Sequence, residues 1–287
     1  MERRYEVPRE IGQLCTKLRR GGYEAYPVGC AVRDLVMGRT PGDWDVTTSA
    51  PPTMTAALFA GAARPTGLAH GTVTVDTGIG SVEVTTFRRE GPYSDGRRPD
   101  WVVFVRELFY DLIRRDFTMN AMALDADGSI IDPFDGTADL ERKIIRTVGA
   151  PDRRFKEDGL RMFRAVRFAA QLDFDLGEDE KTALAAHPQW GGTVSPERVR
   201  IEVEKSLCGM SPARLETAFS SGLMDRFLDV SVVPDLSGLS NVPATPVARW
   251  GALCDALTEC GGVRTPEEFL RRFHMEKKTV KAVGNRM

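Results

Sequence analysis

Two aspartates separated by one residue, Asp43 and Asp45, are the first candidates for chemistry in this 287-residue chain. On a β-strand, side chains two positions apart point to the same face, so both carboxylates are predicted to face one side of a strand. Carboxylate oxygens, with other positions left to water and phosphate, are the usual ligands of Mg²⁺ in proteins. An isolated Asp-x-Asp is more often a turn or surface pair, so the magnesium hypothesis depends on its neighbours.

The segment before the aspartates supplies a turn and a basic residue. Gly29 is predicted to make a tight turn into a short helix at residues 31–37, whose first amides suit a triphosphate. Arg33 lies one turn into this helix, where its guanidinium could reach a phosphate or a ribose. Asp34 beside it is expected to orient Arg33. These residues predict a nucleotide next to the two carboxylates.

A second cluster, RRDFTMNA at residues 114–121, combines charge with an amide. Arg115 offers a charge-assisted fork to phosphate. Asp116 is expected to hold that arginine or to act as a further acid near the metal, and Asn120 to contact a ribose hydroxyl. Glu83, on a predicted neighbouring strand, is a candidate third acid. A capped strand entry would explain Asn120 but not two adjacent arginines.

A third cluster, EDGLRMFRAVRF, is predicted to be helical from the spacing of its apolar residues. Four charged residues stand three positions apart on it: Asp158, Arg161, Arg164 and Arg167. Neighbours in such a row face each other on a helix. For an isolated segment, the simplest interpretation is a salt-bridged helix face.

Two regions of different character must position these clusters. The first alternates short strands and helices, and the second, from residue 151 onward, has the periodicity of helices. Strands are predicted at residues 23–28, 72–76, 82–87, 121–124, 130–131 and 144–147, and the longer later helices at residues 155–172 and 196–207. Residues 88–99, rich in charge, Gly and Pro, are predicted to form a mobile loop that carries Asp95, Arg97 and Arg98.

These motifs, in this order, resemble the signatures of the tRNA nucleotidyltransferase and bacterial poly(A) polymerase family, and within it the class II enzymes. GCAVRD followed by DWDVTT, then RRDFTMNA, then EDGLRMFRAVRF, are similar to its first, second and nucleotide-selecting motifs. The resemblance extends from about residue 28 to about residue 204. One position departs: Cys30 stands where the family has glycine. A glycine lets the backbone approach a nucleotide closely, so Gly29 and Cys30 are expected to contact the nucleotide less tightly.

The resemblance implies an α+β fold. A nucleotidyltransferase head with a small mixed β-sheet and flanking helices is expected at residues 1–147, an all-helical neck with the nucleotide-selecting motif at residues 148–208, and a helical body at residues 209–287. In the family the two aspartates carry catalytic magnesium ions. The implied reaction is transfer of CMP and AMP from CTP and ATP to the 3′ end of tRNA. Relatives usually continue with more helices that hold the tRNA elbow, which indicates a truncated chain or a partner that completes it.

The same resemblance assigns nucleotide selection to an aspartate and an arginine, here Asp158 and Arg161, with Arg164 and Arg167 further along the helix. A carboxylate accepts from the exocyclic amine that C and A both carry, and an arginine donates to ring acceptors. Uracil presents a carbonyl instead, which would leave the buried carboxylate without a donor. A preference for C and A without a template follows.

Three activities stay open within the family: addition of the whole CCA, addition of only part of it, or synthesis of a poly(A) tail. An intact loop at residues 88–99 and the lack of a further basic tail favour CCA addition. A rival of another class is a non-catalytic nucleotide- or RNA-binding relative, for which Cys30 is the motive. The intact acids Asp43 and Asp45 argue against it.

Whole-chain properties set the compartment rather than the chemistry. A net charge of −2 does not indicate a nucleic-acid binder, but RNA is held by local patches. Five cysteines without short spacings argue against a disulfide framework and favour a reducing compartment. The N-terminal residues lack the apolar core of a signal peptide, and no apolar run is long enough to span a membrane. A cytoplasmic protein without a membrane partner is predicted, and its oligomeric state is left open.

Overall fold

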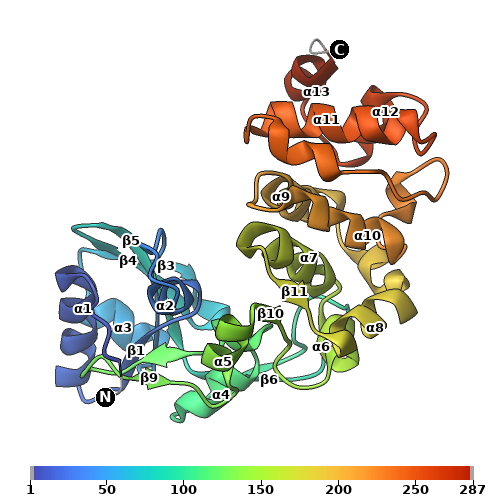
Figure 1. Cartoon of the computed structure of the whole chain (residues 1–287). Helices are drawn as coiled ribbons and strands as arrows, with labels where there is room; N and C mark the ends of the chain where they lie inside the picture. The colour runs from blue at the N-terminus through green and yellow to red at the C-terminus, as the bar shows by residue number, and fades with distance from the viewer. Residues whose placement is uncertain (1–2, 285–287) are drawn as a thin grey trace. The chain divides into compact units, whose positions relative to one another are not determined.

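The computed structural model describes residues 3–284, which divide into two compact units (Figure 1). The first comprises the residues up to Pro92 together with Pro99–Arg142 and Arg146–Gly149. The second comprises Tyr93–Arg98, Lys143–Ile145 and the residues from Ala150 onward. The tip of the predicted loop at residues 88–99 thus belongs to the second unit. Separate neck and body domains, at residues 148–208 and 209–287, stay a prediction.

A mixed sheet forms the centre of the first unit, with strand order β3-β4-β5-β2-β1-β8-β9. Its strands are β1 (Ala25–Val28), β2 (Asp45–Thr48), β3 (Ala63–Gly67), β4 (Thr72–Thr77), β5 (Gly80–Thr86), β8 (Ala123–Leu124) and β9 (Ile130–Ile131). Only the β2–β5 pair is parallel, and the other neighbours are antiparallel. The unit's helices are α1 (Arg9–Arg20), α2 (Cys30–Val36), α3 (Pro52–Leu58), α4 (Leu108–Ile113) and α5 (Gly136–Arg142).

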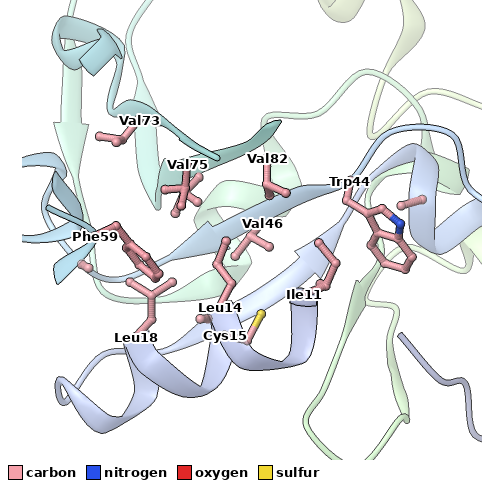
Figure 2. Close-up of a cluster of buried hydrophobic side chains, with 14 residues drawn as sticks. Ile11, Leu14, Cys15, Leu18, Trp44, Val46, Phe59, Val73, Val75 and Val82 are labelled. Atoms are coloured by element: carbon pink, nitrogen blue, oxygen red, sulfur yellow. The ribbon is translucent and has the colours of Figure 1, made fainter. Parts of the chain in front are cut away.

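Helix α1 covers one face of this sheet because its apolar residues recur every three to four positions. Figure 2 shows them directed at side chains of β2, β4 and β5 and at Phe59, which directly follows α3. The buried members that the figure labels are Ile11, Leu14, Cys15, Leu18, Trp44, Val46, Phe59, Val73, Val75 and Val82. Strand β5 alternates as a half-buried strand should, since Val82 and Val84 are buried whereas Glu83 between them is exposed. The core therefore fixes which face of the sheet carries polar groups.

The segment predicted as a mobile loop begins as a strand. Strand β6 (Arg88–Glu90) pairs antiparallel with β7 (Val102–Phe104) in a separate two-stranded ribbon. The prediction of a loop over all of residues 88–99 was wrong at its start. Local composition could not show the pairing, because the partner strand lies beyond the Gly- and Pro-rich stretch.

Helices dominate the second unit. They are α6 (Pro151–Glu157), α7 (Leu160–Leu172), α8 (Glu178–Ala186), α9 (Pro196–Leu207), α10 (Glu216–Ser220), α11 (Pro246–Glu259), α12 (Pro266–Arg272) and α13 (Lys277–Gly284). One short parallel pair, β10 (Ile144–Ile145) with β11 (Asp175–Leu176), joins them. Among the helices of the described residues, none is long and apolar enough to cross a membrane.

The helix predicted at residues 155–172 is broken into α6 and α7. Asp158 has extended backbone angles (φ −146°, ψ 108°) and ends α6. At Gly159 an added Cβ would lie 2.1 Å from the carbonyl oxygen of Trp190, so the chain passes that backbone too closely for a side chain. Apolar periodicity continues across the break, which is why the sequence predicted one helix. The α+β fold class itself is confirmed.

Candidate active site

The two aspartates lie at the start of β2 rather than along it. Asp45 is the first residue of the strand, and Asp43 lies in the bend before it. The prediction that both stand on a strand was wrong for Asp43. The reason is the partner strand: Val28 pairs with Asp45, and at Gly29 the chain turns away, which leaves no ladder partner for Asp43. Both aspartates are nevertheless exposed, on either side of the buried Trp44.

Asp45 lies among like charges. The parallel register pairs it with Glu83 on β5, on the exposed side of the sheet. Desolvation raises the pKa of the Asp45 carboxyl, and the charges of Glu83 and Asp43 raise it further, whereas Arg115 lowers it. The net result is a pKa above the ordinary value. A carboxylate in these surroundings is stabilised by any added cation.

Gly29 lets Asp45 and Arg115 lie close to its own backbone. Its backbone has a positive φ of 76°, which favours glycine. A Cβ at this position would lie 3.2 Å from Nη1 of Arg115 and 3.8 Å from Oδ2 of Asp45. The turn before α2 therefore packs closely against both Asp45 and Arg115. A side chain here would be strained and would press on the guanidinium.

Arg33 is a buried structural centre, only 4% exposed. Its guanidinium donates to Asp34 at 2.7 and 2.9 Å, as the sequence predicted, and to Oδ1 of Asn120 at 3.1 Å. Its Nη1 also lies 3.4 Å from Sγ of Cys30. The structure thus brings Arg33, Asn120 and Cys30 together. Within the described residues, the amide oxygen of Asn120 is already engaged by a guanidinium.

The residue that positions the adjacent arginines is Asp111, which the sequence analysis missed. Its carboxylate is fully buried. Oδ1 accepts from Arg114 at 2.7 and 3.0 Å, while Oδ2 accepts from Arg115 at 3.2 Å and from the Thr47 hydroxyl at 3.0 Å. Its spacing of three and four residues before the arginines is the spacing of ion pairs on a helix, and could have identified it.

The pKa of Asp111 reflects this setting. Desolvation by burial raises the pKa, but Arg114 and Arg115 outweigh it, and the pKa of Asp111 is lowered. Asp111 is therefore an anion that holds two guanidinium groups in place. Asp116, proposed as a further acid, accepts from the backbone N–H of Phe117 at 2.8 Å and faces the amide nitrogen of Asn120 at 3.5 Å.

These groups surround a small polar pocket of about 250 Å³ in the first unit. It is lined by Val28, Asp45, Val46, Thr72, Glu83, Thr85, Arg88, Arg114 and Arg115. The lining thus combines three arginines with two carboxylates. Basic and acidic groups together suit a ligand that combines phosphates with a divalent cation. Arg88, the third arginine, was not among the predicted site residues.

The residues of this site fit a magnesium ion whose remaining ligands are waters and phosphates of the substrate. Within residues 3–284, no group of three or more His, Cys, Asp or Glu side chains is arranged to hold a metal ion alone. Mg²⁺ is commonly bound by only one or two carboxylates, together with waters and substrate phosphates. Asp43 and Asp45 could form such a pair: desolvation raises the pKa of Asp45, and the charges of Glu83 and Asp43 raise it further.

In the second unit, Asp158 and Arg161 have ion-pair partners outside the row of charged residues that the sequence analysis singled out. Asp158 pairs instead with Arg198 on α9, whose Nη2 and Nη1 lie 2.9 and 3.4 Å from its two oxygens. Arg161 donates to Glu157 at 2.6 Å. The break at Gly159 is the physical reason, because it takes Asp158 out of the helical row. The three arginines do share one helix, α7.

The other residues of this cluster are also engaged. Arg167 donates to Gln171 at 2.9 Å, and its guanidinium lies 3.7 Å above the ring of Phe168. Arg164 lies over the same ring at 5.3 Å. Arg161 stands 5.7 Å from the ring centre of Tyr93, a residue at the tip of the β6–β7 connection.

That connection is locally organised. The carboxylate of Asp95 accepts from the backbone N–H groups of Arg97 and Arg98 at 2.8 and 2.7 Å. These two bonds lower the pKa of Asp95 below its ordinary value. The three predicted loop residues therefore form one turn of the second unit.

Comparisons with known proteins agree on one class. Residues 25–146 match the model of the poly(A) polymerase head domain. The crystal structure of the Bacillus stearothermophilus CCA-adding enzyme in complex with CTP is similar, with a TM-score of 0.83 and 39% identity, over 98% of this chain and 69% of that one. The sheet, the carboxylate pair and this match define a nucleotidyltransferase.

The family follows from closely related sequences. The CCA-adding enzyme of Geobacillus thermodenitrificans is 45% identical over 94% of this chain and 67% of its own length. That of Levilactobacillus brevis is 40% identical over 97% and 70%. This chain belongs to the family of CCA-adding enzymes, the tRNA nucleotidyltransferases that its motifs resemble. Enzymes of this family use divalent metal ions.

Proposed function

We propose that this protein transfers CMP and AMP from CTP and ATP to the 3′ end of tRNA, completing or repairing the CCA terminus and releasing pyrophosphate. The observation that carries the proposal is Asp45. Its carboxyl lines a pocket with three arginines, and its pKa is raised by desolvation first and then by the charges of Glu83 and Asp43, against the effect of Arg115. In a family of CCA-adding enzymes, that arrangement is best explained as the site of nucleotidyl transfer.

Asp43 and Asp45 would hold the magnesium ions, with Glu83 as an accessory acid. When bound, two such ions activate the attacking hydroxyl and stabilise the oxygens of the leaving group. The fit depends on charge: the paired carboxylates gain a counter-ion, and the substrate supplies the remaining ligands.

Arg88, Arg114 and Arg115 are proposed to bind the triphosphate in the pocket beside Asp45. Negative charge on the phosphates grows as the bond to the leaving pyrophosphate breaks, and guanidinium groups fixed in advance stabilise it without reorganisation. Asp111 supplies that fixation for Arg114 and Arg115. Arg33 and Asn120 are proposed to support the turn at Gly29, where the nucleotide would approach the backbone.

Selection of the base is proposed to reside in the second unit, on Asp158 and Arg161. Asp158 would accept from the exocyclic amine of C or A, and Arg161 would donate to a ring acceptor. In the structure Arg198 occupies both oxygens of Asp158, and Glu157 binds Arg161. Base reading would therefore need Asp158 to share or exchange its arginine.

The test is incubation with radiolabelled CTP or ATP and a tRNA transcript that lacks its CCA. We expect two C residues and one A to be added in the presence of Mg²⁺, and none with a chelator. Addition of C alone would identify a CC-adding enzyme, and long A tracts a poly(A) polymerase. If nothing is incorporated by folded protein, the proposal fails and a non-catalytic RNA- or nucleotide-binding role replaces it.

A further inference from the structure

The ribbon formed by β6 and β7 places an aromatic ring beside the candidate catalytic pocket. Its register pairs Phe104 with Arg88, and the side chains of directly paired residues lie on the same face. Arg88 lines the pocket that contains Asp45, so Phe104 is on the pocket side of the ribbon. Phe104 is 42% exposed, whereas Val103, which alternates to the opposite face, is 52% exposed.

Gly71 holds this ring next to the pocket. It is buried and directly precedes Thr72, which lines the pocket. Its φ of 83° favours glycine, and an added Cβ would lie 2.7 and 3.4 Å from two carbon atoms of the Phe104 ring. One edge of the ring therefore rests on the Gly71 backbone, while a large part of Phe104 stays open to solvent.

The pocket itself offers charge rather than a stacking surface. Apart from Val28 and Val46, its lining residues are charged or carry a hydroxyl group. The base and the 3′-hydroxyl of the last RNA nucleotide are attached to one ribose, so this base must lie close to the reacting hydroxyl. Under the proposed function the incoming base is read in the second unit, which leaves the last base of the RNA to the rim of the pocket. An aromatic ring at that rim provides the flat surface that such a base needs.

The strand order puts the ring on the side from which the RNA must approach. The incoming nucleotide is proposed to lie at the Gly29 turn after β1, whereas Gly71 precedes β4, and Asp45 on β2 lies between them in the order β4-β5-β2-β1. Attacking and leaving oxygens stand roughly in line on opposite sides of the phosphorus. With pyrophosphate leaving toward the Gly29 turn, the RNA hydroxyl enters from the side of β4. Arg88, which donates to the carbonyl of His70 on this side, would then meet the phosphate under attack.

We propose that the base of the last RNA nucleotide stacks on Phe104 while the 3′-hydroxyl of that nucleotide reacts at Asp45. The inference rests on the proposed function and names the residue that positions the primer end. Stacking on an aromatic ring tolerates any sequence, because every base has a flat face. This tolerance suits a primer whose last nucleotide changes with each addition.

The test is a binding cycle that needs no catalysis. Binding of a tRNA transcript that lacks CCA is measured by fluorescence anisotropy without nucleoside triphosphate, once with an ordinary last nucleotide and once with an abasic one. Phe104→Ala is expected to raise Kd for the ordinary RNA about tenfold, within the range for loss of one base–aromatic stack. The parent should bind the abasic RNA as weakly, and Phe104→Ala should change that Kd little, because the stack is already absent.

Val103→Ala is the matched control, because Val103 is the neighbouring exposed residue on the opposite face of the same strand. It should bind both RNAs as the parent does. Phe104→Leu keeps apolar bulk against Gly71 but has no flat ring, so it should weaken binding of the ordinary RNA nearly as much as Phe104→Ala. Phe104→Tyr should retain most of the binding. The Leu and Tyr variants decide the matter even if Phe104→Ala fails to fold.

An unchanged Kd of folded Phe104→Leu for the ordinary RNA, or equal weakening for both RNAs, would overturn the stacking surface. A raised KM for CTP with an unchanged Kd for RNA would also overturn it, because the ring would then contact the incoming nucleotide. These results leave the proposed function intact as long as the parent incorporates CMP. Conversely, RNA binding that depends on both the ring and the last base, without incorporation by the parent, would support the surface and count against the proposed catalysis.

Discussion

Two carboxylates of this protein have opposite electrostatic surroundings. Asp45, at the start of β2, lies beside Glu83 on β5 and two residues after Asp43, and its pKa is raised by desolvation and by these two charges. Asp158 is held through both oxygens by Arg198. The first group lies where a cation would relieve repulsion, whereas the second already has its cation. The two carboxylates therefore differ in how far protein cations neutralise them.

Because Asp158 has an arginine partner and Asp45 lies among like charges, a ligand meets different conditions at the two carboxylates. Under the proposed function, a divalent ion that binds beside Asp45 would reduce the repulsion from Glu83 and Asp43. A base that reaches Asp158 must compete with a guanidinium. Under the proposed function, part of the interaction energy of such a base would be spent on displacing Arg198, which lowers the net gain for a base that can donate to the carboxylate.

The largest expected effect comes from removing either acid of the first site. Asp45→Ala and Asp43→Ala should each lower the rate of CMP incorporation by roughly 10³-fold, because several kcal/mol of transition-state stabilisation are lost with a metal ligand. Single-turnover assays with saturating CTP measure this directly. Asp76→Ala, an exposed aspartate of β4, is the matched control and should retain full activity. Near-normal turnover of Asp45→Ala would show that Asp45 does not hold the catalytic metal.

The next effect concerns stability. Asp111→Asn should lower the free energy of unfolding by about 3 kcal/mol at neutral pH, since two arginines lose a buried counter-ion. The pKa of Asp111 is lowered by Arg114 and Arg115, so this stabilisation is present above the ordinary carboxyl pKa and is lost as the pH falls. Urea unfolding at pH 7 and near pH 4 should show a difference from the parent that shrinks in acid.

Asp127→Asn provides the control for that measurement, because Asp127 forms an exposed pair with Arg4 at 3.4 Å. It should leave the unfolding curve nearly unchanged at both pH values. If Asp111→Asn also has no effect, the two arginines are held by other contacts, and their role as a fixed wall of the pocket needs another explanation.

The sequence predicted the fold class well, because it depends on local patterns. Alternation in β5 and the apolar stripe of α1 determine the sheet and its cover. Partners of charged residues were harder to predict. Asp158 finds Arg198 forty residues away, and the break at Gly159 depends on the backbone of Trp190, so neither could be deduced from spacing along one helix. Asp111 was within reach, since its spacing to two arginines is helical.

The next prediction concerns Asp158, the second carboxylate. Asp158→Ala should raise the relative use of UTP, because a uracil carbonyl no longer meets a negative oxygen, and Arg161→Ala should weaken CTP and ATP together. Each effect should be about 5- to 150-fold, from 1–3 kcal/mol for a hydrogen bond that involves a charged group. Steady-state kinetics with all four nucleoside triphosphates measure both.

Arg198→Gln distinguishes base reading from a structural ion pair. With the carboxylate still present but less firmly oriented, exclusion of UTP should weaken by a smaller factor than in Asp158→Ala. A purely structural pair predicts that both variants lose stability and keep the nucleotide preference of the parent. Unchanged exclusion of UTP by Asp158→Ala would therefore end the assignment of base reading to this residue.

The smallest expected effect lies in the turn between β6 and β7. Tyr93, the residue before the deleted segment, stands beside Arg161, and Asp95 closes the turn through the N–H groups of Arg97 and Arg98. If this turn helps the second unit change from C to A, deletion of residues 94–98 should spare CTP incorporation and lower addition of the terminal A about tenfold, a cost of about 1.4 kcal/mol. Gel analysis of the extended tRNA resolves the two steps, and Asp95→Asn, which keeps the turn's size, should have a weaker effect in the same direction. Equal loss of C and A addition would show that the turn serves binding in general. It would then play no part in the change from C to A.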